Sequence, residues 1–353
     1  MIPTEPIGSI PRPPALQQAQ AAFAAGKATR AQLDVAAAAA LHDTLQRFEK
    51  TGSPIVTDGE QTKPSFVSYP LAGLTNLAPD GVVIPFADGH TRQLPRLTAG
   101  PFRYATYAGT YVTAAKKLTQ LPVKQAVIAP SVLSLLYPQA GIPGYPQAKF
   151  LEDLIAESEA DIRSAFTAGA DSVQLDFTEG RLAVKLDPSK GVLRSFIDLN
   201  NKVLARFTPA ERARIGVHTC PGGDHDSTHS ADVPYGELLP DLFRLHVGRF
   251  YLQLASEKDR RTVLGLIKSN LKPGQRVFVG VTDPLNPRIE SAEEVRDRVL
   301  AAAKAIPIAQ LGTCDDCGFA PFADDTSTSR DIAFAKIAAR VMGTQLASER
   351  LKA

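Results

Sequence analysis

The sequence predicts an α/β fold of the (β/α)8 TIM barrel class, and three observations support this prediction. Eight apolar, β-rich runs recur along the 353 residues. Patterns typical of amphipathic helices lie between them. Strands that are apolar almost throughout and alternate with helices pair in parallel and are buried on both faces. Eight such units favour a closed barrel, and an open, doubly wound parallel sheet is the alternative.

The expected strands are spread over the whole chain. They occupy residues 6–10, 55–59, 126–130, 172–177, 215–220, 250–255, 277–283 and 310–314. The clearest helical patterns cover residues 150–168, 192–207, 258–270, 292–306 and 332–347. Thr208-Pro209, and Ser291 followed by Glu293 and Glu294, are typical helix starts.

One region departs from this alternation. Residues 71–110 are rich in Gly and Pro, and residues 81–86, the turn Asp88-Gly89 and residues 93–97 predict a β-hairpin. We therefore expect a single barrel domain over residues 1–353, with an insertion at about 71–110 after the second strand. Residues 141–147 and 221–234 form further long loops after strands, where the active face of a barrel lies.

The composition limits the classes of partner. Lys and Arg total 39 against 37 Asp and Glu, so the net charge is too small to attract nucleic acid or an anionic membrane. The N-terminus lacks the pattern of a signal peptide, and no run reaches the roughly 18 apolar residues of a membrane span. We expect a cytoplasmic protein that acts on a small uncharged or zwitterionic molecule, and a homodimer is left open.

The strongest local motif is His218-Thr219-Cys220 at the end of the fifth expected strand. Residues two apart on a strand point to the same side, so the imidazole and the thiol can converge on one ion. Nitrogen and sulfur ligands together suit Zn²⁺. The alternative is a buried histidine and a buried cysteine that are neighbours by accident.

A second motif, Cys314-Asp315-Asp316-Cys317, follows the last expected strand. A redox pair usually opens a helix, whereas this one closes a strand among acidic residues that would raise thiol pKa values. In a barrel the fifth and eighth strands end at the same mouth, so Cys317 can reach an ion held by His218 and Cys220. Cys314 is the alternative ligand, and a redox pair is the alternative function.

Acidic side chains also gather at the ends of expected strands, where they more often serve a site than a fold. Each one could instead cap a helix or carry a solvated loop charge. Together they would accommodate a cationic amine. They are Asp58, Glu60, Asp176, Glu179, Glu257 and Asp283. The remaining histidines are interpreted as surface or satisfied core residues: His42, His90, His225, His229 and His246.

These motifs together resemble the catalytic half of cobalamin-independent methionine synthase, a zinc-dependent (β/α)8 barrel. The resemblance covers essentially the whole chain. It rests on Ile7-Gly8-Ser9, Gly59-Glu60, Gln174-Leu175-Asp176, His218-Thr219-Cys220 and Asp316-Cys317-Gly318. The two metal motifs are specific when they occur together in this order.

The resemblance implies a methyltransferase that makes methionine from homocysteine. Zn²⁺ on His218, Cys220 and Cys317 would bind the sulfur of homocysteine, and Ser9, Glu60 and Asp176 would hold its amino acid part. The thiolate formed on the metal would then attack a methyl group carried on nitrogen.

Three departures from the family concern the fourth ligand and the donor. The family's glutamate ligand aligns with Ala255, and Glu257, two residues on, is the candidate replacement. The chain has no Trp to stack on a pterin. In Asp283-Pro284-Leu285-Asn286-Pro287 the candidate catalytic Asp283 is kept, but Leu285 replaces the family's histidine.

The chain also lacks the family's separate N-terminal barrel and is expected to be a stand-alone core form. The methyl donor is therefore open between methyltetrahydrofolate and a corrinoid. One rival function keeps the zinc and alkylates another thiol, as coenzyme M alkyltransferases do. Another resembles uroporphyrinogen decarboxylase, which needs no metal, and a third is a carrier that stores zinc or a corrinoid without turnover.

Overall fold

A computed structural model describes residues 1–352, and its centre is a parallel sheet. Six strands follow one another in the order β12-β11-β10-β7-β6-β5. Their bounds are β5 Lys124–Ile128, β6 Ser172–Asp176, β7 Ile215–Thr219, β10 Arg249–Leu252, β11 Arg276–Thr282 and β12 Leu311–Asp315. Nearly all of their residues are buried, as expected for parallel strands covered on both faces.

Two extended segments from the N-terminal part of the chain close this sheet. Thr4 forms a parallel bridge with Thr313 of β12, and Val56 forms one with Val123, directly before β5. The two segments also meet each other, because the amide of Ile10 donates to a carbonyl oxygen of the second segment at 3.0 Å. The predicted (β/α)8 barrel is confirmed, and the open sheet is excluded.

These two segments form isolated bridges instead of long strands. Pro3, Pro6 and Pro54 lie within two residues of the bridging positions. Proline has no N–H group to donate to a neighbouring strand, so a continuous ladder cannot form there.

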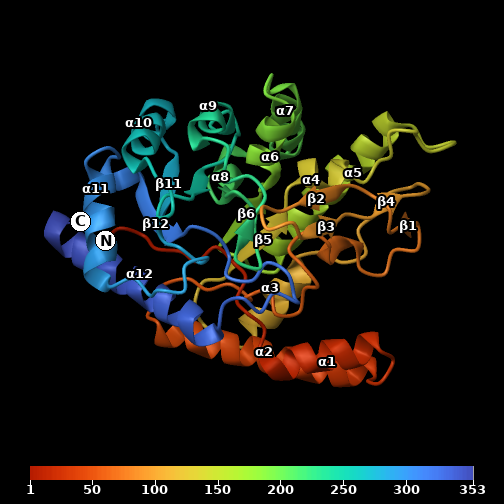
Figure 1. The fold of residues 1–353 in the computed structure, drawn as a ribbon, viewed down its shortest axis with the longest axis horizontal. Coiled ribbons are helices and arrows are strands. Elements are labelled where there is room, and N and C mark those ends of the chain that lie inside the picture. The colour runs from red at the N-terminus through yellow and green to blue at the C-terminus, as the bar shows by residue number, and fades with distance from the viewer. Residues whose placement is uncertain (353) are drawn as a thin grey trace.

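Helices surround the barrel (Figure 1). The long ones are α2 Arg30–Lys50, α5 Gln147–Thr167, α7 Gly191–Leu204, α10 Arg260–Asn270, α11 Ala292–Ala303 and α12 Arg330–Leu351. The five predicted helices are therefore present. The expected starts are also right, because Thr208 accepts a hydrogen bond from the third residue of α8 (Pro209–Arg212) and Ser291 accepts one from the third residue of α11.

The remaining helical elements are short or lie at the periphery. They are α1 Pro14–Ala24, α3 Gly109–Lys116, α4 Pro130–Ser134, α6 Glu179–Leu186, α8 Pro209–Arg212, α9 Leu239–Leu242, η1 Tyr69–Leu71, η2 Tyr235–Glu237 and η3 Ile308–Gln310. Figure 1 shows α1 and α2 together along one edge of the molecule, where the two helices contact each other. No helix within residues 1–352 combines the length and the apolar character needed to cross a bilayer.

The region 71–110 contains two short antiparallel pairs. β2 Val83–Pro85 pairs with β3 Thr91–Gln93 across the turn at Asp88-Gly89, and β1 Leu77–Ala78 pairs with β4 Arg96–Leu97. The expected second arm, residues 93–97, is thus divided between two partners. Pro95 explains the division, because it cannot donate a hydrogen bond to a continuing strand. In the loop after β7, β8 Gly223–Asp224 pairs with β9 Ser227–Thr228.

Candidate active site

Three side chains with metal-binding atoms converge at the mouth of the barrel. His218 is the fourth residue of β7, Cys220 directly follows this strand, and Cys317 lies two residues after β12. One ligand atom from each residue lies within 4.8 Å of the other two, and the two Sγ atoms are 3.1 Å apart. The structure therefore brings together the three residues that the two sequence motifs pointed to.

The loop that carries Cys317 is fixed to the end of β10. The carboxylate of Asp316 accepts hydrogen bonds from the backbone amides of Leu254, Ala255 and Ser256 at 2.8, 2.8 and 2.7 Å. Its Oδ1 atom lies so close to Gly280 that a Cβ atom there would be 1.8 Å away. Asp316 thus ties together the ends of three neighbouring strands and holds Cys317 in place.

One ring nitrogen of His218 is hydrogen-bonded, and the other has no hydrogen-bond partner among the described residues. Nδ1 lies 3.3 Å from the carbonyl oxygen of Tyr251, which acts only as an acceptor, so Nδ1 carries the proton. Nε2 is buried and has no hydrogen-bond partner in the described part of the chain. A buried polar atom without a partner is unfavourable, and a bound metal ion would satisfy it.

The donor set fits zinc. One imidazole nitrogen and two sulfurs are ligands that Zn²⁺ prefers, and three protein ligands leave a fourth position for a substrate atom. The hydrogen bond from the Cys317 thiol lowers the pKa of Cys220 well below its usual value, and the neighbouring His218 acts in the same direction. The centre therefore favours a thiolate at Cys220.

Two other candidate ligands lie away from this cluster. Oε1 of Glu257 accepts hydrogen bonds from Arg181 at 2.7 Å and from Gln253 at 2.8 Å, so this carboxylate is already paired. The thiol of Cys314 is buried in the barrel and donates to the carbonyl of Phe278 at 3.4 Å. Burial raises the pKa of Cys314 well above its usual value. The structure thus leaves Cys314 in the barrel core and places Cys317 beside Cys220.

The three expected substrate-binding residues line the same cavity as the metal cluster. Ser9, Glu60 and Asp176 all contribute to its wall. Ser9 is held by the segment after Cys317, because its Oγ accepts a hydrogen bond from the amide of Ala320 at 3.2 Å. The cavity thus combines groups from the first, second, fourth, fifth and eighth strand ends.

The nearby cations do not fully offset the burial of the Glu60 and Asp176 carboxyl groups in this cavity. Burial raises the pKa of Glu60 to about 7, although Lys63 opposes this at 3.4 Å. Oε2 of Glu60 is buried without a partner among the described residues. Burial also raises the pKa of Asp176, whose Oδ1 accepts a hydrogen bond from Gln174 at 2.7 Å. A ligand ammonium group would stabilise both carboxylates.

Arg12 positions the Glu60 loop, and the sequence reasoning missed it. Glu60 has a φ of 57°, a left-handed conformation that is unfavourable for a residue with a side chain. The buried guanidinium of Arg12 donates to the carbonyl oxygens of Glu60 at 2.8 Å and of Lys63 at 3.2 Å. It also donates to the carbonyls of Ala320 and Phe322. In the sequence, the sign of this role is a charged arginine within a mainly apolar N-terminal segment.

Asp283, the expected catalytic residue, lies outside this cavity. Its Oδ1 accepts a hydrogen bond from the amide of Leu285 at 3.1 Å, and its own amide donates to Glu290 at 2.9 Å. Burial raises the pKa of Asp283. Its hydrogen bonds within residues 283–290 stabilise the loop after β11.

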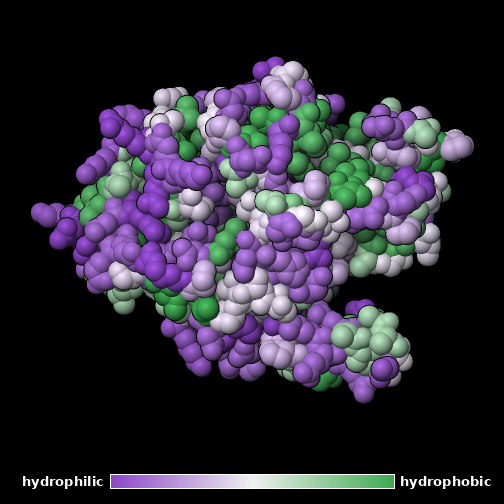
Figure 2. Space-filling model, viewed as in Figure 1, coloured by the Kyte–Doolittle hydropathy of each residue, from purple (hydrophilic) through white to green (hydrophobic). Residues whose placement is uncertain are grey.

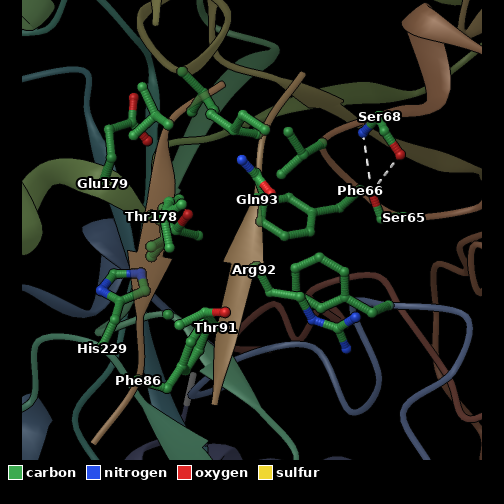
Figure 3. Close-up of a pocket in the computed structure, with 18 of the residues that line it drawn as sticks. Ser65, Phe66, Ser68, Phe86, Thr91, Arg92, Gln93, Thr178, Glu179 and His229 are labelled. Carbon is green, nitrogen blue, oxygen red and sulfur yellow. Dashed lines mark hydrogen bonds between the residues drawn. The ribbon is translucent and has the colours of Figure 1, made fainter. Parts of the chain in front are cut away.

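A much larger cavity of about 980 Å³ adjoins the metal cluster. Phe66, Thr178, Gly222 and Gly223 line both cavities. Figure 2 shows hydrophobic side chains gathered where α6, α7 and the β2–β3 hairpin meet. Figure 3 shows Thr178, Glu179 and His229 on one side of the larger cavity and Arg92 and Gln93 of the hairpin across from them. The sequence did not reveal this cavity, because it forms between loops and an insertion.

Together, the fold and the cluster define a (β/α)8 barrel with a candidate zinc centre at the carboxyl ends of its strands. The family described as the catalytic domain of cobalamin-independent synthase matches residues 2–340. The chain belongs to this family.

Curated relatives share this region at low identity. A 5-methyltetrahydropteroyltriglutamate–homocysteine methyltransferase of Synechococcus sp. (strain JA-2-3B'a(2-13)) is 23% identical over 320 residues, which are 90% of this chain and 40% of that protein. The protein of the same name from Mycobacterium tuberculosis (strain ATCC 25618 / H37Rv) is 24% identical over 321 residues, with the same coverage. The chain spans about 40% of the length of these relatives.

Solved structures of similar size share the fold. A B12-independent methionine synthase from Shewanella sp. W3-18-1, in complex with selenomethionine, has a TM-score of 0.79 and 21% identity, and the match covers 100% of this chain and 99% of that one. A putative vitamin-B12 independent methionine synthase from Listeria monocytogenes has a TM-score of 0.74 and 20% identity, with 98% and 99% covered.

Proposed function

We propose that the protein is a zinc-dependent methyltransferase that converts homocysteine to methionine. One observation carries this proposal: a cluster of one imidazole and two thiols shares a cavity with the buried carboxyl groups of Glu60 and Asp176. The first group of residues suits a thiol bound to a metal, and the second suits an ammonium group. Homocysteine carries both. The names of the curated relatives support the same reaction.

His218, Cys220 and Cys317 would hold the zinc. Zinc bound there would supply a thiolate at neutral pH, because coordination lowers the pKa of a thiol. The protein residues have separate tasks. The Tyr251 carbonyl fixes the imidazole of His218, and Asp316 fixes the loop of Cys317.

Glu60 and Asp176 orient the substrate. Their carboxylates bind its ammonium group, and Ser9 lies beside them in the cavity wall. The sulfur of a substrate held in this way would lie beside the cluster, next to the adjoining large cavity. Holding both reactants in a reactive geometry accounts for much of the rate enhancement of such reactions.

The transfer is a displacement at the methyl carbon. A sulfur–carbon bond forms, and the bond between the methyl carbon and the donor breaks. The electron pair of that bond stays on the donor, and the thiol proton leaves to solvent. Methyltetrahydrofolate and a methyl corrinoid are the two donor classes in question.

The first experiment measures metal content and activity together. Purified protein is analysed for zinc and assayed for methionine formation from homocysteine with each donor. We expect about one zinc per chain and methionine formation that stops when a chelator removes the metal. A metal-free sample that still forms methionine would rule out the proposal.

A matched pair of variants isolates the cluster. Cys317→Ala removes a proposed ligand, and Cys314→Ala removes the neighbouring thiol that lies in the barrel core. We expect Cys317→Ala to lose zinc and activity and Cys314→Ala to keep both. Equal zinc loss in the two variants would contradict the proposed ligand set.

A further inference from the structure

The large cavity beside the cluster has mainly apolar walls. The β2–β3 hairpin contributes Val82, Ile84 and Phe86, and the opposite side contributes Leu182 and Phe196 from α6 and α7. Its volume of about 980 Å³ is at the upper end of the range for small-molecule sites. Because it shares four lining residues with the metal cavity, a ligand in it can place one end beside the cluster.

The cavity offers no unpaired positive charge. Arg92 is its one lysine or arginine among the described residues. The guanidinium of Arg92 binds Asp224 at 2.5 and 3.1 Å and Asp324 at 2.9 and 2.9 Å. Two carboxylates therefore more than neutralise it. An anionic chain, such as a polyglutamate tail, would find no cation in this wall.

Glu179 supplies an unused polar group in this wall. It is only 5% exposed, and its Oε1 accepts a hydrogen bond from the hydroxyl of Ser131 at 2.5 Å. Its Oε2 is buried and has no partner in the described residues. Burial raises the pKa of Glu179 to about 8, which favours the protonated carboxyl group at neutral pH. It can then donate one hydrogen bond.

His229 supplies the complementary group on the other side of Thr178 (Figure 3). Its Nδ1 lies 2.9 Å from the hydroxyl of Ser230, which in turn lies 3.1 Å from the carbonyl of Pro221. The Ser230 hydroxyl donates its hydrogen to this carbonyl and therefore accepts a hydrogen bond from Nδ1. The ring proton is then on Nδ1, and Nε2 is an unprotonated acceptor. Burial lowers the pKa of His229 to about 4, so the ring is uncharged.

We propose that this cavity binds the methyl donor, that Glu179 and His229 hold it as hydrogen-bond donor and acceptor, and that the cavity selects a donor without an anionic tail. The preferred ligand is a largely apolar, uncharged heterocycle with one hydrogen-bond acceptor and one N–H group. This inference rests on the proposed methyl transfer for its assignment to the donor, but the binding preference can be measured without turnover.

Calorimetric titration of the zinc-loaded full chain tests the preference. The probes are a 5-methyltetrahydropterin without glutamate and 5-methyltetrahydrofolate with three glutamates. We expect the triglutamate form to bind no more tightly than the tail-less form. A Kd at least about tenfold lower for the triglutamate form, or no binding of the tail-less form, overturns the proposal.

Substitutions distinguish the cavity from other surfaces. Glu179→Ala should weaken binding of the tail-less pterin about tenfold, and Glu179→Gln, which keeps a donor group, should largely restore it. Leu186 lies at the rim and is 74% exposed, so Leu186→Lys adds a cation with little risk to the fold. It should tighten binding of the triglutamate form only. Unchanged pterin binding in Glu179→Ala contradicts the proposed site.

The outcomes also separate this inference from the proposed function. Methionine formation together with a tenfold preference for the triglutamate form upholds the methyl transfer and rejects the inferred selectivity. Binding of the tail-less pterin that depends on Glu179, without methionine formation from any donor, upholds the binding preference and rejects the proposed reaction.

Discussion

The Sγ atoms of Cys220 and Cys317 lie 3.1 Å apart, although the two residues are 97 positions apart in the chain. Both thiols are free, and the lowered pKa of Cys220 favours its thiolate. Thiolate character makes a cysteine reactive toward oxidants. This pair is therefore both a candidate metal centre and a site of oxidation when no metal protects it.

We expect mild oxidation of metal-free protein to link Cys220 to Cys317. Two thiols lose two electrons and two protons to the oxidant, and one disulfide forms. Zinc added beforehand should prevent the reaction. Peptide mapping by mass spectrometry identifies the linked residues. The buried Cys314 should remain a thiol, and a disulfide that contains Cys314 would argue against the observed arrangement.

The fold could be predicted because its pattern is local. Apolar strands alternating with helices specify the barrel, and the spacing of His218 and Cys220 on one strand places both side chains on the same side. Cys317 could be added because parallel strands end at a common mouth. These steps need only chain order and strand geometry.

The rest of the site depends on packing that sequence order does not reveal. Glu257 lies two residues from the position of the family's fourth ligand, yet Arg181, 76 residues away, pairs with it at 2.7 Å. Arg12 reaches backbone carbonyls of two other loops. The large cavity beside the cluster likewise forms only where the hairpin insertion meets α6 and α7. No local pattern specifies such contacts between distant segments.

Glu60→Gln should impair homocysteine binding without removing the metal. The substitution keeps the shape but removes the charge that would pair with the ammonium group. We expect KM for homocysteine to rise about tenfold or more, since a charge-assisted hydrogen bond contributes roughly 1.5–3 kcal/mol. Steady-state kinetics and zinc analysis measure the two effects. Unchanged kinetics would favour a thiol without an amine, such as coenzyme M.

Arg12→Lys should disturb the substrate loop. Lysine carries its donors on one atom and cannot span the carbonyls of two loops as the guanidinium does. We expect a loss of about 1–3 kcal/mol in the free energy of unfolding and a larger change in KM than in kcat. Urea unfolding and kinetics provide the measurements.

The matched control for Arg12→Lys is Arg30→Lys. Arg30 forms an exposed ion pair with Asp34 on α2, and such pairs contribute little to stability. This variant should behave like the wild type. If both variants lose the same stability and leave KM unchanged, Arg12 has no positioning role.

Glu179→Gln should flatten the pH dependence of stability. Burial raises the pKa of Glu179 from 4.5 to about 8, so the folded state binds more protons than the unfolded state between these values. Stability conferred by the protonated carboxyl is therefore present below about pH 4.5 and is lost as the pH rises toward 8. Glutamine does not titrate, and the variant should lose less stability over this range, by up to several kcal/mol. Urea unfolding at pH 5, 7 and 9 compares the two proteins, and parallel curves would show that Glu179 does not titrate in the fold.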